Sequence, residues 1–275
     1  MNLTIFSFIG ASLYLIGGSL LVKRLFKNQA PGPTAALLQK KWILSITLVA
    51  TVIHMGILYT TIILEPGEGL NFGFFNAVSL MCWLIALLIT IAGFSKPLEN
   101  LGIVMFPMAG LAVVLELYLP SNHIVLLNNA ENLRFHIVIS IMAYSLLTLA
   151  AIQACLLAVQ NQYLRNKHPG GFVRALPPLE TMESLLFQLL GLGFVFISLA
   201  LITGVVYLEN IFEQHLVHKT VLSLISWGLV GILLWGRWRF GWRGRTAVRW
   251  TLAAFVVLVL SYFGSKLVLE LILQR

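Results

Sequence analysis

Charged side chains are scarce in this sequence, and aspartate is missing altogether. Asp, Glu, Lys and Arg make up 10% of the residues, whereas about 25% is usual in soluble domains. Stretches of about 20 apolar residues, each long enough to cross ~30 Å of hydrocarbon, recur along the whole chain. The scarcity of charge excludes a soluble globular domain, and we predict that residues 1–275 form a single transmembrane domain.

Cysteine is rare as well, and the familiar catalytic motifs are missing. Cys82 and Cys155 both lie inside apolar stretches, so the sequence contains neither a CxxC pair nor a disulfide framework. It also lacks a phosphate-binding loop, an HExxH zinc motif and a Ser–His–Asp order. We therefore predict that the protein is not an enzyme.

The apolar stretches predict an all-α fold, a polytopic bundle of about eight transmembrane helices. The expected helices cover residues 3–22, 42–64, 72–94, 101–119, 136–159, 185–208, 218–236 and 250–272. Basic residues follow the first stretch and none precedes it, which is the reverse of a cleavable signal peptide, so we expect a retained first helix. The prolines of "PPLE" at 177–180 mark a further helical start.

The basic residues predict the orientation. If the loop after the first helix is cytoplasmic, 14 of the 18 Lys and Arg residues lie inside; the other four are Arg134, Lys219, Lys266 and Arg275. The positive-inside rule then places both termini outside. The net charge of +8 reflects these loops, and we expect no nucleic-acid partner. The Trp- and Arg-rich stretch 235–250 lies at an inner boundary, where such side chains meet membrane lipid.

Two histidines occupy matching positions at the predicted outer boundary. His136 opens the fifth expected helix and His218 opens the seventh, while Arg134 and Lys219 lie within two residues of them. Imidazole pairs ligate haem iron axially, and Arg or Lys pairs with haem propionates. We therefore predict a b-type haem at the outer face, with His136 and His218 as the iron ligands.

Other interpretations of these outer residues stay open. Histidines at helix ends commonly pack or cap, and Arg134 is at helical spacing from Glu131, which would give an ordinary ion pair. A zinc site at His215 and His218 is less favoured, because three or four ligands would be needed.

Two further ionisable residues lie within expected helices. His54 is near the middle of the second helix, where an ionisable group indicates function; a neutral contact between helices is the alternative. Mid-span lies ~15 Å from the outer edge, so we do not expect His54 to share the iron of the outer pair unless its helix is tilted or displaced. Glu116, near the outer end of the fourth helix, could snorkel outward or serve a proton or cation path.

Several blocks resemble the cytochrome c assembly family of haem-handling membrane proteins, most closely its short HemX-like and YpjD-like inner-membrane members. They span roughly residues 50 to 265. The blocks are "GFFNAVSLMCW" (73–83), "FHIVISIMAYSLL" (135–147), "LPPLETMESLLFQLLGLGFVFISLALITG" (176–204), "HKTVLSLISWGLVGILLWGRWRFGWRGR" (218–245) and "LSYFG" (260–264).

The resemblance implies a multi-pass protein of the bacterial inner membrane. By position, His136 matches the family's first external haem-ligating histidine, and His54 corresponds more weakly to an intramembrane histidine of the larger members. That correspondence makes His54 a candidate haem-binding residue, with a buried haem station near it and an outer one near His136 and His218. Their tryptophan-rich external motif and second external histidine have no counterpart in this sequence. Depth in the membrane, rather than the family pattern, makes His218 the expected second ligand.

Together these observations predict an inner-membrane protein that binds haem and handles or senses it, in cytochrome complex assembly or in haem homeostasis. The expected partners are haem, membrane lipid and other cytochrome-assembly or membrane proteins. Two alternatives remain: a non-haem membrane scaffold, and a cation or proton transporter that uses Glu116, His54 and His136.

Overall fold

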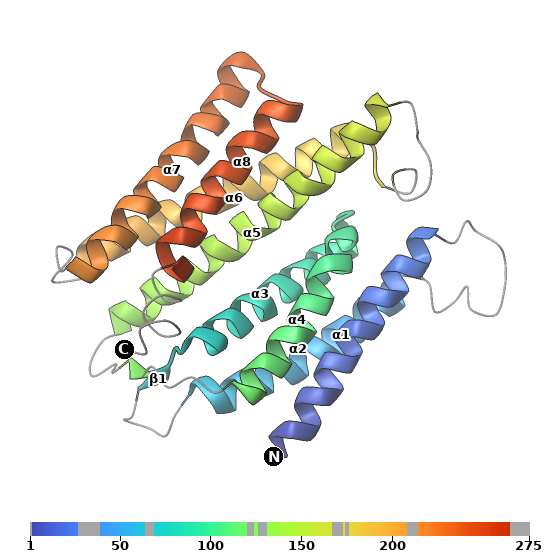
Figure 1. Cartoon of the computed structure of the whole chain (residues 1–275), viewed down its shortest axis with the longest axis vertical. Helices are drawn as coiled ribbons and strands as arrows, with labels where there is room; N and C mark the ends of the chain where they lie inside the picture. Colours follow the sequence, from blue (N-terminus) through green and yellow to red (C-terminus); the bar gives the residue numbers. More distant parts are fainter. Residues whose placement is uncertain are drawn as a thin grey trace. The chain divides into compact units, whose positions relative to one another are not determined.

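The computed structural model of the chain is almost entirely helical (Figure 1). It describes residues 2–26, 39–63, 69–119, 124–125, 131–166, 173, 176–207 and 214–264, without the side chains of 125, 131, 132, 207, 214–216, 218, 263 and 264. In these ranges eight helices are long and apolar enough to cross a membrane. This confirms the predicted all-α bundle, while the orientation of the termini stays a prediction.

The contacts between helices divide the chain into two compact units. Unit 1 comprises Met1–Asn128 and Pro169–Leu176, and unit 2 comprises Asn129–His168 and Pro177–Arg275. The first four membrane helices belong to unit 1 and the last four to unit 2. The prediction of a single transmembrane domain is not tested by this division and stays a prediction.

Unit 1 is a ring of four helices with a short β-ladder at one end. Its elements are α1 (Leu3–Phe26), α2 (Lys40–Ile62), β1 (Leu70–Asn71), α3 (Phe74–Ser95), the 3-10 helix η1 (Glu99–Leu101), α4 (Gly102–Tyr118) and β2 (Ile124–Val125). Helices α1 and α3 each pack against both α2 and α4. Strands β1 and β2 pair antiparallel, which ties together the segments that follow α2 and α4.

Small residues let α1 and α4 approach closely. A Cβ atom added to Gly110 of α4 would lie 3.1 Å from the carbonyl oxygen of Ala11. One added to Gly18 of α1 would lie 3.0 Å from Cδ of Pro107. Larger side chains at these glycines would push the two helices apart, and close backbone approach through small residues is typical of membrane helix pairs.

Within unit 1, polar side chains face the interior and apolar ones face outward. On α2, Val52 and Met55 are 64% and 58% exposed, whereas the His54 between them is 0% exposed. The hydroxyls of Thr47 and Thr90 lie 3.2 Å apart inside the unit and join α2 to α3. An apolar exterior and hydrogen-bonded interior suit a lipid environment, where polar groups must find partners within the protein.

Unit 2 is a second ring of four helices. Its elements are α5 (Glu131–Arg165), α6 (Leu179–Tyr207), α7 (Gln214–Phe240), α8 (Gly244–Val259) and the π-helical turn η3 (Leu260–Gly264). Helices α5 and α7 each pack against both α6 and α8. Hydropathy marks only the section within hydrocarbon, so α5, α6 and α7 are longer than the spans expected from the sequence.

The start of α6 follows the proline signal. The helix begins at Leu179, directly after Pro178, as "PPLE" predicts. Two glutamines of α5 hold this start: Gln160 Nε2 donates to the Pro177 carbonyl at 2.8 Å, and Gln153 Nε2 donates to the Met182 carbonyl at 2.9 Å. Side-chain amides thus satisfy carbonyl groups where α6 begins.

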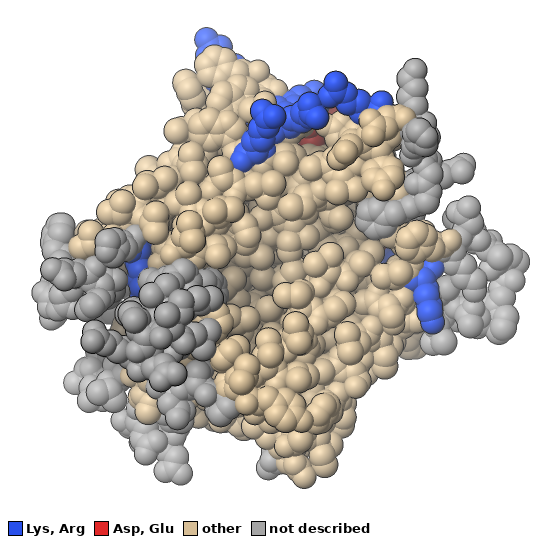
Figure 2. Space-filling model, in the orientation of Figure 1, with Lys and Arg blue, Asp and Glu red and all other residues tan. Residues whose placement is uncertain are grey.

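Lysine and arginine side chains gather at the ends of helices. In the face drawn in Figure 2, most of the described surface is tan, and a red acidic side chain lies beside the upper blue group. In unit 1, Lys23, Arg24, Lys40 and Lys96 all lie at one end of the ring, at the end of α1, the start of α2 and the end of α3. We call this the inner end, following the orientation predicted from the sequence.

Candidate functional site

His136 lies in the second turn of α5 and contacts α6. Its Nδ1 atom is 2.9 Å from the hydroxyl of Thr203. That hydroxyl donates its own proton to carbonyl groups of α6, at 2.8 Å to Leu199 and 3.1 Å to Ala200. With its proton directed to one of these carbonyl groups, Thr203 Oγ1 is free to accept a hydrogen bond from Nδ1–H. In this neutral tautomer the lone pair of the imidazole is on Nε2.

The other side of the His136 ring is held less tightly. Nε2 lies 3.4 Å from the Ser140 hydroxyl, one turn further along α5. The ring also packs on the backbone of α6, since a Cβ atom added to Gly204 would lie 3.2 Å from Cε1 of His136. A ring oriented through Nδ1 with its lone pair on Nε2 is the arrangement that metal-ligating histidines commonly have.

The other predicted outer residues differ in what the structure describes. Arg134 is exposed at the start of α5. His218 lies in the second turn of α7, and its side chain is outside the described residues, as are those of Glu131 and His215. The structure therefore leaves the predicted pairing of His136 with His218 untested.

Lys219 joins α7 to the end of α8. Its Nζ atom is 5.6 Å from the centroid of the Tyr262 ring, and its carbonyl accepts a hydrogen bond from the Ser261 hydroxyl at 3.0 Å. Ser261 Oγ is also 2.9 Å from Ser223 Oγ. The Tyr144 hydroxyl of α5 donates to the Leu258 carbonyl at 3.2 Å.

This polar cluster at the predicted outer end of unit 2 was missed in the sequence analysis. It draws on α5, α7 and α8, and its members are far apart in the chain. The one available signal was "LSYFG" at 260–264, a polar interruption of the last apolar stretch. Lys219 is thus positioned against α8 and η3.

His54 lies in the interior of unit 1. Its Nδ1 is 3.3 Å from the Tyr14 hydroxyl of α1, and its Nε2 is 2.9 Å from the Ser79 hydroxyl of α3. Both nitrogens therefore face neutral hydroxyl groups, and the residue links three helices. A metal at either nitrogen would have to replace one of these hydrogen bonds. The geometry favours the neutral interhelical contact that the sequence left open.

Glu116 is buried rather than extended toward water. The residue is 5% exposed, and its Oε1 accepts a hydrogen bond from the Thr61 hydroxyl of α2 at 2.5 Å. The sequence allowed a snorkelling side chain at this position. The structure excludes that alternative for the conformation described, because the carboxyl points between α4 and α2.

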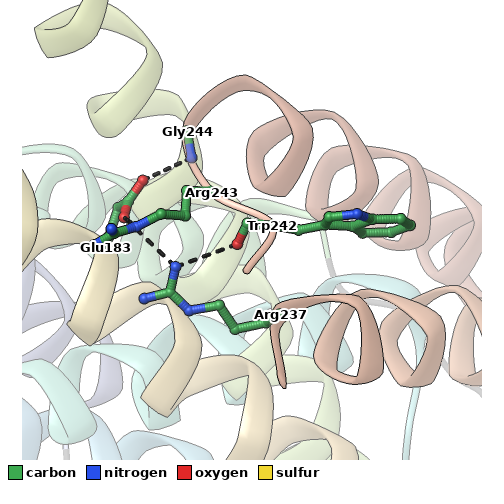
Figure 3. Close-up of polar contacts among 5 residues, drawn as sticks. All are labelled: Glu183, Arg237, Trp242, Arg243 and Gly244. Carbon is green, nitrogen blue, oxygen red and sulfur yellow. Dashed lines mark hydrogen bonds and ion pairs between the residues drawn. The ribbon is translucent and has the colours of Figure 1, made fainter. Parts of the chain in front are cut away.

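A carboxylate clamp holds the inner end of unit 2 (Figure 3). Glu183 Oε1 accepts the Gly244 backbone N–H at 2.6 Å, and Oε2 accepts from Arg243 Nε at 3.3 Å. Arg237 Nη1 lies 3.9 Å from Oε2 and donates to the Trp242 carbonyl at 3.3 Å. Glu183 thus joins the second turn of α6 to the connection between α7 and α8.

Glycine is required in that connection. Gly241 and Gly244 have φ angles of +67° and +52°, a left-handed conformation that strains residues with a Cβ atom. From the sequence we expect the arginines of this stretch to meet lipid, whereas the structure gives Arg237 and Arg243 the carboxylate of Glu183 as a partner. The available signal was a second glutamate, Glu183, one turn after Glu180 in an otherwise apolar helix.

Membrane-length helices with an apolar exterior and internal polar contacts define the chain as a polytopic membrane protein. More specifically, it belongs to the cytochrome C assembly protein family, whose model matches residues 42–273. The match begins in α2 and runs through the last helix, so it includes residues of both units and His54, Glu116, His136 and Glu183.

Three curated relatives show the range of similarity. Inner membrane protein YpjD of Escherichia coli (strain K12) is 32% identical over 225 residues, which is 82% of this chain and 85% of the relative. Protein HemX of Brevibacillus brevis is 21% identical over 55% of this chain and 58% of its own length. Cytochrome c biogenesis protein CcsA of Gloeothece citriformis is 26% identical over 40% of this chain and 34% of its own. No solved structure matches the chain.

Proposed function

We propose that this chain is a multi-pass protein of the bacterial inner membrane that binds b-type haem and handles or senses it in cytochrome complex assembly or haem homeostasis. Three findings support the proposal: membership of the cytochrome C assembly protein family, the similarity to an inner membrane protein over most of both chains, and the weaker similarity to a cytochrome c biogenesis protein.

The observation that carries the haem proposal is the orientation of His136. The Thr203 hydroxyl lies 2.9 Å from Nδ1, and when it accepts from Nδ1–H, Nε2 carries the lone pair that an iron ligand needs. Gly204 leaves room for the ring against α6. The residues present therefore fit one axial ligand, with Thr203 as the group that sets the tautomer.

Haem, when bound, supplies an iron that takes axial ligands and two propionates that take cations. His136 would ligate the iron through Nε2, and His218, at the corresponding position of α7, is the proposed second ligand. Arg134 is exposed beside His136 and is the proposed propionate partner, together with Lys219. The protein's contribution would be ligation, charge pairing and shielding from water, with no bond-making step of its own.

The test is the absorption spectrum of the full-length protein purified from haem-replete cells. The wild type is expected to show a Soret band, and His136→Ala is expected to lose most of it or to change its position. His218→Ala should also change the spectrum if that residue is the second ligand. A wild type that is colourless and does not take up added haemin would contradict the proposal and favour the scaffold alternative.

Thr203→Val separates ligation from folding, because it keeps the histidine and removes the hydroxyl that orients it. Loss of such a supporting hydrogen bond commonly lowers metal affinity about 10- to 100-fold, which a haemin titration would measure. Ser198→Ala is the matched control: its hydroxyl is on the same helix and bonds Trp227 rather than His136. It should bind haemin as the wild type does.

A further inference from the structure

The carboxyl of Glu116 is only half satisfied. Thr61 donates to Oε1, whereas Oε2 has no hydrogen-bond partner among the described residues, although the side chain is buried. An ionised carboxylate in an apolar interior is costly unless a counter-charge or further hydrogen bonds compensate it. The unpartnered oxygen therefore requires an explanation.

No basic side chain in the described part of unit 1 can reach this carboxyl. Glu116 lies 14 residues after Gly102, the first residue of α4, which corresponds to about 21 Å along the helix. The basic residues lie at the opposite, inner end, where Arg24 and Lys40 contact Glu99 at 3.9 Å and 3.2 Å. The connecting segments 64–68 and 120–123 are outside the described residues.

The titratable described residues near Glu116 in unit 1 offer it no positive charge: they are uncharged groups and a histidine with neutral partners. Tyr14 of α1 and Cys82 of α3 are buried and supply no positive charge. Ser79 of α3 is near enough to interact with the Glu116 carboxyl, although its hydroxyl makes no hydrogen bond to Oε2. Its hydroxyl separates that carboxyl from His54, whose nitrogens both face hydroxyl groups.

A small monovalent cation at Oε2 would compensate the negative charge of the buried carboxylate. A proton would make the carboxyl neutral, and a sodium ion would pair with it and take hydroxyl oxygens as further ligands. A divalent ion is a poorer match, because it would leave an excess positive charge and demands more oxygen ligands than one carboxyl and one hydroxyl.

We propose that Glu116 and Thr61 form a monovalent-cation site inside unit 1, occupied by a proton or by a sodium ion. The site is separate from haem binding and does not depend on it. From Glu116, a series of polar groups leads deeper into the unit, through Ser79 and His54 to Tyr14, with hydrogen-bonded steps of 2.9 Å and 3.3 Å. The site thus lies at one end of a polar path that crosses from α4 to α1.

Dicyclohexylcarbodiimide tests the proton form directly. The O–H of a protonated carboxyl in an apolar site adds across one C=N bond of the reagent, and the acyl group then migrates to nitrogen and leaves a stable N-acylurea. The full-length protein would be treated at a series of pH values, in choline chloride or in sodium chloride, and the modified residues identified by peptide mass spectrometry.

Each occupant gives its own result. With a proton, Glu116 is modified, the modification declines as the pH rises, and sodium has no effect. With sodium, the ion protects Glu116 from modification, and it raises the Tm of the wild type but not that of Glu116→Gln. Glu183 is the internal control, because its carboxylate is held by two arginines and a backbone N–H and should stay unmodified.

Infrared spectroscopy detects a protonated Glu116 even if the carbodiimide cannot enter unit 1. A protonated Glu116 gives a carboxylic-acid C=O band that is absent from Glu116→Gln, whether or not the carbodiimide reaches the site. Any one of these signals supports the proposal. It is overturned if Glu116 stays unmodified at every pH, the infrared band is missing, and sodium does not change the Tm of the wild type.

Discussion

Each unit contains a described histidine within its helices, and the two differ in burial and in their hydrogen-bond partners. In unit 1, His54 is 0% exposed and both ring nitrogens face hydroxyls from other helices. In unit 2, His136 lies near the start of α5, with one nitrogen bound at 2.9 Å and the other only 3.4 Å from its nearest hydroxyl. His54 is fully buried and both of its partners come from other helices, so it stabilises packing. The partner of His136 Nε2 is Ser140 on the same helix, and a ligand that displaces it breaks no contact between helices.

Their inner ends differ in a similar way. Each unit has a carboxylate beside two cations, namely Glu99 with Arg24 and Lys40, and Glu183 with two arginines. Glu183 additionally accepts the Gly244 backbone N–H. Glu99 contacts only flexible side chains, whereas Glu183 also fixes the backbone of a tight turn. The contacts of Glu183 should therefore contribute more to stability than those of Glu99.

The largest expected effect comes from removing the clamp of unit 2. Glu183→Ala leaves Arg237 and the Gly244 N–H without their carboxylate. We expect a loss of about 3 kcal/mol in the free energy of unfolding, at the lower end for a broken buried ion pair because the arginines are partly exposed. Unfolding in detergent, followed by tryptophan fluorescence, measures this loss. A change below about 1 kcal/mol would show that the turn holds without Glu183.

Removing the interior histidine should cost somewhat less. His54→Ala opens a cavity and leaves the hydroxyls of Tyr14 and Ser79 without their shared partner, for which we expect a loss of about 2 kcal/mol. The same unfolding measurement applies. By contrast, His136→Ala should change stability little in the absence of haem. Equal losses for both variants would remove the distinction between the two histidines.

The fit of His136 against α6 can be tested without touching a polar group. Gly204→Ala places a Cβ atom 3.2 Å from Cε1 of His136, so the ring must shift. We expect about 1 kcal/mol of overpacking and weaker haemin binding in a titration. Gly191→Ala on the same helix meets nothing within 4 Å and should leave haemin binding unchanged. Identical behaviour of the two variants would show that the ring position is not critical.

The smallest effect is expected at the inner end of unit 1. Glu99→Ala removes ion pairs to Arg24 and Lys40, whose side chains are 37% and 24% exposed, and partly exposed pairs contribute up to about 1 kcal/mol. The loss should shrink at high salt, where exposed charges are screened. If Glu99→Ala proves as destabilising as Glu183→Ala, the backbone contact of Glu183 adds no stability beyond the ion pairs.

The general architecture follows from the sequence because each membrane helix needs an apolar stretch long enough to cross the hydrocarbon. Apolar length predicts the eight helices, and "PPLE" predicts the start of α6. The ends of α5 and α7 were less predictable, since polar turns beyond the hydrocarbon continue a helix without changing the hydropathy signal. The division into two units has no local signature and was not foreseen.

The candidate sites were predictable as residues but not as contacts. Depth and residue type singled out His54 and His136, and they raised Glu116 as a possible ion-path residue. No local pattern indicated that Thr203, 67 residues away, would hold His136, or that Glu183 would bind a turn about 60 residues further along the chain. The resemblance in sequence to the family was confirmed by the match to its model over residues 42–273.

By itself, the sequence determined that this is a helical membrane protein of the cytochrome C assembly protein family, because apolar length and local motifs are properties of continuous segments. Only the tertiary structure decided that His54 is enclosed by hydroxyls, that Glu116 is buried with one oxygen unpartnered among the described residues, and that Nδ1 of His136 faces Thr203. These features depend on helices that meet in space, and a hydrogen bond between distant residues leaves no periodic trace in either segment.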